Sequence, residues 1–206
     1  MPNSQLALPY FLPYFVYVAC AALPLAHAPS YGLRLLLTGA ALLYSWRFYQ
    51  GIRGPRSPLG SVVAGFGAGL LGTALWVLLL IEQPGEPWDD TAFLLRLFAA
   101  GLFVPVFEEM ALRGFVLRYL VQMGGAPGGV HAVAPGAWTW RAVLVSSVAF
   151  ALGHRLHEMA AAVAYGLLMA LLWIVRRDLL GCIVAHATTN VTLAFYVRAT
   201  GAWGLW

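Results

Sequence analysis

Long apolar segments dominate this sequence: seven of them follow one another, joined by short polar connections. A helix needs about 20 apolar residues to cross a bilayer, and most of these segments are close to that length. Hydrophobic residues make up 61% of the chain and charged residues 10%, against about 45–50% and about 25% in soluble domains. A soluble core cannot hide that much apolar surface, so lipid must replace water around most of the chain. We place the segments at residues 8–27, 32–49, 59–81, 91–121, 139–154, 158–175 and 179–199.

The composition predicts a fold class and excludes several classes of function. We expect an all-α, polytopic integral membrane helix bundle of about seven or eight transmembrane helices. The length of 206 residues predicts a single integral membrane domain. Within 1–206, residues 1–90 form the N-terminal helices, and residues 91–199 form the helices that carry the motifs described below. Soluble enzymes, nucleic-acid-binding proteins and disordered scaffolds are excluded.

Proline and glycine mark interruptions and close contacts. The fourth segment is too long for one crossing and contains Pro105, which lacks a backbone N–H and is expected to kink the helix or restart it as an eighth one. The turn-forming run over residues 124–129 predicts a loop. Glycines at small-residue spacing in the third segment are expected to allow close helix packing. They are Gly65, Gly67, Gly69 and Gly72.

Charged residues predict the orientation of the helices. The connection after the second segment carries three arginines and no acid, whereas the connection after the third carries four acids and no base. Short, positively charged loops tend to stay in the cytoplasm, so we predict a cytoplasmic N-terminus, in what we expect to be a bacterial inner membrane. Trp203 and Trp206 are expected in the outer aromatic belt. The charged residues are Arg47, Arg53 and Arg56 inside, and Glu82, Glu86, Asp89 and Asp90 outside.

Cys20 and Cys182 show neither CxxC nor metal-ligand spacing, so we expect both to be core residues.

Three groups of polar residues lie inside apolar segments. A charge near the bilayer centre costs about 2.5–3.5 kcal/mol on insertion scales, so such residues suggest function. Glu109 and Arg113 are four positions apart and can pair on one helical face, while Glu108 points about 100° away. The other two groups are His154, and His186 with Asn190 one turn later.

These groups are predicted to lie at a similar depth. The depth of each group is counted along its own helix from the arginine at the predicted cytoplasmic end, with a rise of about 1.5 Å per residue. The depths are about 15 Å for Glu108, 20 Å for His154 and 14 Å for His186. All three values fall near the middle of a core about 30 Å thick. A carboxylate and an imidazole can activate water for hydrolysis, and imidazole and amide N–H groups can donate to an oxyanion. We therefore predict a shared intramembrane site for hydrolysis without a side-chain nucleophile.

The same residues resemble the CPBP family of intramembrane glutamic endopeptidases, which includes the CAAX prenyl proteases and bacteriocin-processing or immunity-associated proteins. The family pattern of EExxxR, FxxxH and then HxxxN or HxxxD occurs in order within residues 91–195, about half of the chain. The matching residues are Glu108, Glu109 and Arg113, then Phe150 and His154, then His186 and Asn190.

The resemblance implies a metal-independent endopeptidase that needs no cofactor. It implies that Glu108 and His154 activate the attacking water, and that His186 and Asn190 form the oxyanion hole. The implied partners are the lipid bilayer and a membrane-anchored protein or peptide, such as one with a C-terminal sorting signal, and not nucleic acid. The residues implied to support and orient the site are Glu109 and Arg113.

Two other functions remain as alternatives. A zinc-dependent intramembrane metalloprotease would use Glu108, His154 and His186 as ligands and leave one position for water, although no HExxH motif is present. A non-catalytic membrane protein, such as an immunity factor or a proton-coupled transporter, would use the same residues to bind a partner or relay protons. A role in binding alone predicts that Glu108 is dispensable. Phe150 is interpreted as core packing.

Overall fold

The computed structural model describes residues 3–80, 84–125 and 128–206, and the regular structure of these residues is entirely helical. The all-α fold is confirmed, because each of the seven predicted segments coincides with a helix. Three helices form one continuous rod from Asp90 to Met123. The helices are α1 (Asn3–Ala21), α2 (His27–Ser45), α3 (Pro58–Leu79), α4 (Asp90–Phe98), α5 (Val104–Glu109), α6 (Arg118–Met123), α7 (Trp140–Ala151), α8 (Met159–Arg176) and α9 (Leu179–Thr200).

Five helical segments are long and apolar enough to cross a membrane. They are α1, α3, the Asp90–Met123 rod, the segment Leu156–Arg176 that contains α8, and α9. The protein is therefore an integral membrane protein. Helices α2 and α7 are not among the five, so the count of seven or eight transmembrane helices stays a prediction.

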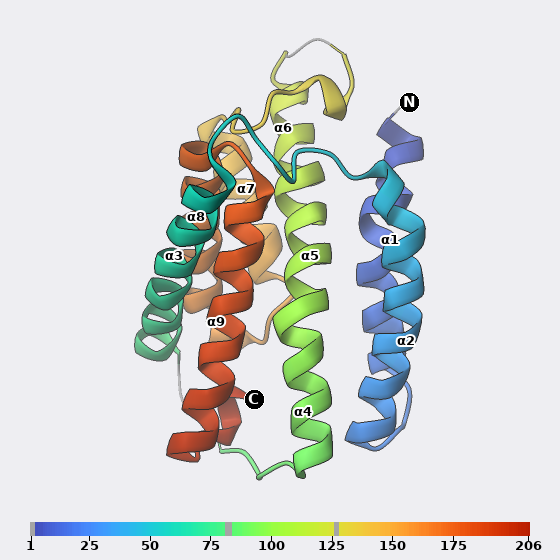
Figure 1. Ribbon diagram of the computed structural model, residues 1–206, viewed down its shortest axis with the longest axis vertical. Coiled ribbons are helices and arrows are strands. Elements are labelled where there is room, and N and C mark those ends of the chain that lie inside the picture. The colour runs from blue at the N-terminus through green and yellow to red at the C-terminus, as the bar shows by residue number, and fades with distance from the viewer. Residues whose placement is uncertain (1–2, 81–83, 126–127) are drawn as a thin grey trace.

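The Asp90–Met123 rod occupies the middle of the bundle. Figure 1 shows it between α1 and α2 on one side and α3, α7, α8 and α9 on the other. Helix α1 packs on α2, α3 packs on α9 and α8, and α7 packs on α8, while α5 contacts both α1 and α9. Polar residues of the rod can therefore be shielded from lipid by protein on both sides.

The rod does not restart at Pro105. Its backbone passes the proline by widening into π-helical turns, Ala99–Phe103 before it and Met110–Leu117 beyond Glu109. In the first of these, the Val104 N–H donates to the carbonyl of Ala99, five residues back. The same register would pair the nitrogen of Pro105 with the carbonyl of Ala100, but proline has no N–H. The Ala100 carbonyl is therefore left for another donor.

Glycines bring α3 close to α9. A Cβ atom at Gly65 would lie 2.6 Å from the carbonyl oxygen of Gly181, and one at Gly69 would lie 2.6 Å from that of Ala185. At Gly72 it would lie 2.7 Å from Oγ1 of Thr189. The predicted close packing is confirmed at these three positions and is wrong for Gly67, whose Cβ would have no neighbour within 4 Å among the described residues.

Opposite charges gather at opposite ends of the bundle. The connection that carries Arg47, Arg53 and Arg56 lies at the same end as the start of α1, and Glu86 and Asp89 lie at the other end, where α4 begins. Glu82 lies outside the described residues, as do positions 126 and 127 of the predicted glycine-rich loop. The membrane side of each end stays a prediction.

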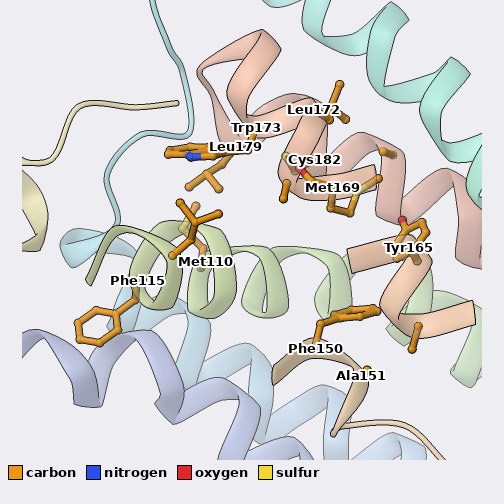
Figure 2. Close-up of a cluster of buried hydrophobic side chains, with 14 of the residues drawn as sticks. Met110, Phe115, Phe150, Ala151, Tyr165, Met169, Leu172, Trp173, Leu179 and Cys182 are labelled. Atoms are coloured by element: carbon orange, nitrogen blue, oxygen red, sulfur yellow. Dashed lines mark hydrogen bonds between the residues drawn. The ribbon is translucent and has the colours of Figure 1, made fainter. Parts of the chain in front are cut away.

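The core lies between the rod and helices α7, α8 and α9. Figure 2 shows Met110 facing the side from which Trp173 and Leu179 approach, and Phe150 lying near Tyr165. Both cysteines are free and buried, as predicted.

The prediction of an outer aromatic belt is wrong for Trp206. This side chain is only 7% exposed, because it folds back onto Phe93, with ring centres 5.1 Å apart.

Candidate active site

Glu109, Arg113 and His186 form a fully buried polar network. Oε1 of Glu109 accepts hydrogen bonds from Nη1 of Arg113, at 3.3 Å, and from Nδ1 of His186, at 2.9 Å. Nη2 of Arg113 donates to the carbonyl of Gly166 at 3.0 Å. The i, i+4 pair predicted from the sequence is thus present, and α9 adds an imidazole to it. This network fixes the ring of His186 with Nδ1 as a donor, since an ionised carboxylate only accepts.

Glu108 points to a different environment from its neighbour in the chain. Its side chain is 16% exposed, whereas that of Glu109 is 0% exposed. Oε2 of Glu108 lies 3.8 Å from Nε2 of His186, on the ring edge opposite the one that Glu109 holds. The imidazole of His186 therefore stands between the two carboxylates.

His154 lies in the turn that follows α7, which ends at Ala151, and not inside the helix as the predicted segment implied. Its Nδ1 lies 3.0 Å from the carbonyl oxygen of Phe150. Because a carbonyl only accepts, Nδ1 carries the proton, and Nε2 of the neutral ring is left as an acceptor. The ring packs against Phe150 and Trp76, with centres 4.6 and 5.2 Å away.

Asn190 supplies the donor that the proline left missing. Its Nδ2 donates to the carbonyl oxygen of Ala100 at 2.8 Å. The side chain therefore ties α9 to the π-helical turn next to Pro105, and π-helical turns often occur at functional sites. One of the two amide N–H groups remains for another acceptor.

Glu108, His154, His186 and Asn190 line a single cavity of about 600 Å³. This volume lies within the range of about 300–1,000 Å³ that is usual for ligand sites. Glu109 and Arg113 do not line the cavity and lie behind His186. The structure thus brings the four predicted catalytic residues to one space and the two predicted supporting residues to its wall.

Aromatic residues complete the wall. Phe150, interpreted from the sequence as core packing, is buried but also touches the site: its ring centre lies 5.9 Å from that of His186 and 5.4 Å from the guanidinium of Arg113. Sequence reasoning missed Tyr165 of α8, whose buried ring centre lies 5.6 Å from that of His186. A tyrosine inside an apolar helix was the available signal, because a buried hydroxyl usually needs a polar neighbour.

The three residues of the zinc alternative do not form a metal site. Within the part of the chain that the structure describes, no three His, Cys, Asp or Glu side chains are grouped so that they could hold a metal ion. The arrangement of Glu108, His154 and His186 therefore gives the zinc alternative no support.

Fold and site together define a class: a helical membrane protein with a carboxylate, two imidazoles and an amide around one cavity. Residues 90–192, half of the chain, match the family described as type II CAAX prenyl endopeptidase Rce1-like. The chain belongs to this family and is a CAAX-type membrane protease, a hydrolase. The family predicted from the three motifs is thereby confirmed. No curated protein and no solved structure matches the chain.

Proposed function

We propose that the protein is a glutamic intramembrane endopeptidase in which Glu108 and His154 activate water to cleave a peptide bond of a membrane-anchored protein or peptide. One observation carries the proposal: Glu108, His154, His186 and Asn190 come from three separate parts of the chain and line one cavity. Membership of the CAAX protease family supports peptide-bond hydrolysis as the reaction.

In the proposed mechanism, Glu108 takes a proton from a water held between its carboxylate and the free Nε2 of His154. The water oxygen bonds to the carbonyl carbon of the substrate, and the carbonyl oxygen becomes an oxyanion. Glu108 then gives the proton to the amide nitrogen as the C–N bond breaks. Positioned proton transfer of this kind contributes about 10²- to 10⁴-fold to a rate.

His186 and Asn190 stabilise the oxyanion. Nδ1 of His186 donates to Glu109, so the ring donates from Nε2 as well only when it is an imidazolium. The second N–H of Asn190 is the other donor. Removing one such donor typically costs about 10²- to 10³-fold in rate.

A lateral groove supports a membrane-anchored substrate. A second, smaller cavity of about 180 Å³ reaches Glu108 between α1, the rod and α7. Its walls are apolar apart from Tyr14 and Glu108 itself, and half-exposed aromatic residues such as Phe15 stand at its edge. An apolar part of a substrate can therefore reach Glu108 from the lipid without crossing water.

The test compares purified wild-type protein with Glu108→Gln on a panel of membrane-anchored peptide tails, prenylated and unprenylated, by mass spectrometry with and without a chelator. We expect cleavage that the substitution abolishes and the chelator leaves unchanged. Cleavage abolished by the chelator would favour the zinc enzyme. Equal activity of the two proteins would remove Glu108 as the base, and cleavage by neither would favour a binding role.

The predicted orientation is part of the proposal. With the N-terminus in the cytoplasm, the cavity faces the outer side, because Leu25, Trp88 and Arg155 at the end opposite the arginine-rich connection line it. A membrane-impermeant maleimide added to intact cells is expected to label Glu86→Cys and not Arg53→Cys. The native cysteines are buried and do not interfere.

A further inference from the structure

Exposed arginines gather at the end of the bundle where α1 begins, which we call the arginine end. Three connections come together there: residues 46–57 after α2, residues 128–139 before α7, and residues 176–178 between α8 and α9 (Figure 1). The tertiary structure thus collects charges from separate parts of the chain on one surface, far from the catalytic cavity's outer mouth. The exposed arginines of this end are Arg47, Arg53, Arg56, Arg141 and Arg177.

Contacts between the three connections make this end one joined surface. The backbone N–H of Leu179, at the start of α9, donates to the carbonyl of Gly51 at 2.9 Å. A Cβ atom at Gly136 would lie 2.5 Å from Cγ of Arg177, so the connection before α7 touches the one before α9 as well. The arginines are therefore carried on a fixed platform and not on three independent loops.

No acidic side chain neutralises the exposed arginines. Asp178 is the only acid in the three connections. It is 1% exposed, and its carboxylate already accepts from Oγ of Ser61 and from the backbone N–H of Gly181. Within the described residues, none of the exposed arginines of this end has a carboxylate within 4 Å. Their charge is left for a partner outside the chain.

Two other arginines of this end are turned inward and show the contrast. Nη2 of Arg118 donates to the carbonyl of Val133 at 2.7 Å. Nη2 of Arg176 donates to the carbonyl of Ser57 at 2.9 Å. These two side chains hold the connections in place, whereas the exposed ones do not.

Aromatic rings order two of the exposed guanidinium groups. That of Arg47 lies 4.9 Å from the ring centre of Tyr44 and 4.8 Å from that of Phe48. That of Arg141 lies 5.3 Å from the ring centre of Trp140. Stacking occupies the face of a guanidinium and leaves the N–H groups at its edges for an acceptor. An ordered edge of this kind suits two oxygens of a phosphate.

Exposed tryptophans place these arginines at the level of lipid headgroups. Trp46, Trp138 and Trp140 are 56%, 53% and 63% exposed, whereas Trp206 at the opposite end is 7% exposed. Tryptophan is enriched at membrane–water interfaces, where its ring lies among the headgroups. Arg141 stacks on one of these rings, and Arg47 follows Trp46 in the chain, so both lie where lipid phosphates lie.

We infer that the arginine end binds anionic phospholipids, with Arg47 and Arg141 each holding a headgroup phosphate beside an aromatic ring. The other three exposed arginines add charge that favours an anionic lipid over a zwitterionic one. The predicted orientation of the chain needs only the charge of these connections, whereas phosphate binding needs ordered guanidinium planes. The rings favour a lipid over an acidic protein, because an acidic protein would meet the charges alone. The inference is independent of the proposed function.

The test measures lipid binding and does not depend on catalysis. Wild-type protein in a neutral detergent is titrated with phosphatidylglycerol or with phosphatidylcholine of the same acyl chains, and the bound lipids are counted by native mass spectrometry. We expect phosphatidylglycerol to bind about tenfold more tightly, because the choline charge offsets the phosphate contact. Free glycerol phosphate is added as a competitor, and we expect it not to displace the lipid at the same concentration.

Substitutions assign the preference to the two stacked arginines. Arg47→Gln and Arg141→Gln are each expected to weaken phosphatidylglycerol binding about fivefold. Arg47→Lys and Arg141→Lys keep the charge but lose the planar fork, so we expect an intermediate loss, and these variants guard against misfolding in the glutamine variants. The matched control is Arg198→Gln, which removes an arginine that is stacked on Phe93 and paired with Asp90 at the opposite end. We expect it to leave the preference unchanged.

Four results would overturn the inference. Equal binding of the two lipids would remove the anionic preference, and an equal loss in Arg141→Gln and Arg198→Gln would reduce it to net charge. Displacement of the lipid by glycerol phosphate at equal concentration would make this a site for soluble phosphates. Binding of a polyglutamate peptide that the glutamine substitutions abolish, with no preference between the lipids, would make it a surface for an acidic protein.

Discussion

The Asp90–Met123 rod has two faces that differ in how their charges are treated. On one face, Glu109 and Arg113 are 0% exposed, bonded to each other and bonded to groups of α8 and α9. On the other face, Glu108 and Arg96 line a cavity, and no hydrogen bond to either side chain occurs within the described residues. The two carboxylates of this comparison are neighbours in the chain.

The difference separates structural charges from reactive ones. A buried ion pair with well-placed hydrogen bonds is costly to break, and its groups have few hydrogen-bonding positions left for a ligand. A charge at a cavity wall without internal partners keeps its capacity for water, substrate or an opposite charge. We therefore expect substitutions on the Glu109 face to act first on stability, and substitutions on the Glu108 face to act first on activity or binding.

The largest effect on stability is expected for Glu109→Gln. Its loss leaves Arg113 and His186 without their shared carboxylate, and breaking a buried pair costs about 3–5 kcal/mol. The free energy of unfolding is measured by SDS titration in mixed micelles. Glu108→Gln is the matched control and is expected to change it by less than about 1 kcal/mol. Equal losses in the two variants would mean that the two faces do not differ as described.

Asn190→Ala tests whether one side chain can have both a structural role and a catalytic role. If its free N–H stabilises the oxyanion, kcat falls about 10²- to 10³-fold, while the lost bond to Ala100 costs stability only about 1 kcal/mol. Thr192→Ala is the control, because it removes hydrogen bonds made by the same helix away from the cavity, to the carbonyl of Thr188 and to the hydroxyl of Thr73 in α3. A loss of stability with no fall in kcat of the folded fraction would limit Asn190 to anchoring the π-helical turn.

Gly69→Ala tests the close packing of α3 on α9, in which no charged group takes part. The added Cβ meets the α9 backbone, and overpacking costs about 1–3 kcal/mol. Gly67→Ala is the matched control in the same helix, because its Cβ would have no neighbour within 4 Å in the described part of the chain, and it is expected to be neutral or stabilising by up to about 1 kcal/mol. Thermal melts in one detergent compare the two. Similar melting temperatures would show that α3 and α9 do not need close contact here.

The smallest expected effect is the coupling between Glu109 and Arg113. In a double-mutant cycle, Glu109→Gln with Arg113→Met is expected to cost less than the sum of the two single changes, by about 0.5–3 kcal/mol. Removing both partners leaves no uncompensated charge, whereas removing one does. Additive single effects in SDS titrations would mean that the pair contributes nothing as a pair.

The helices and the motif residues could be predicted from the sequence because both are local properties. Hydropathy over about 20 residues marks a helix whatever surrounds it, and the spacing of Glu109 and Arg113 places them on one face of any helix. The restart at Pro105 was wrong because a π-helical register and a donor from α9, Asn190, compensate for the missing N–H. Neither is visible from the rod's own sequence.

The partners that a site residue finds on other helices could not be predicted. The motifs predicted that Glu108 acts together with His154, but they did not predict that Nε2 of His186 lies 3.8 Å from Glu108 while Nδ1 of the same ring bonds to Glu109. Trp206 was expected at the outer interface and instead packs beside Arg96 in the cavity wall.

The sequence by itself determined that this is a helical membrane protein of the CAAX protease family, because composition and motif order are properties of the chain alone. Only the tertiary structure decided which carboxylate faces the cavity, which imidazole stands between the two, and that Arg34 joins Arg96 in the cavity wall from a distant helix. The reason is geometric: the rotation and register of each packed helix decide which side chains meet, and these depend on contacts between segments far apart in the chain, such as the glycine contacts of α3 with α9.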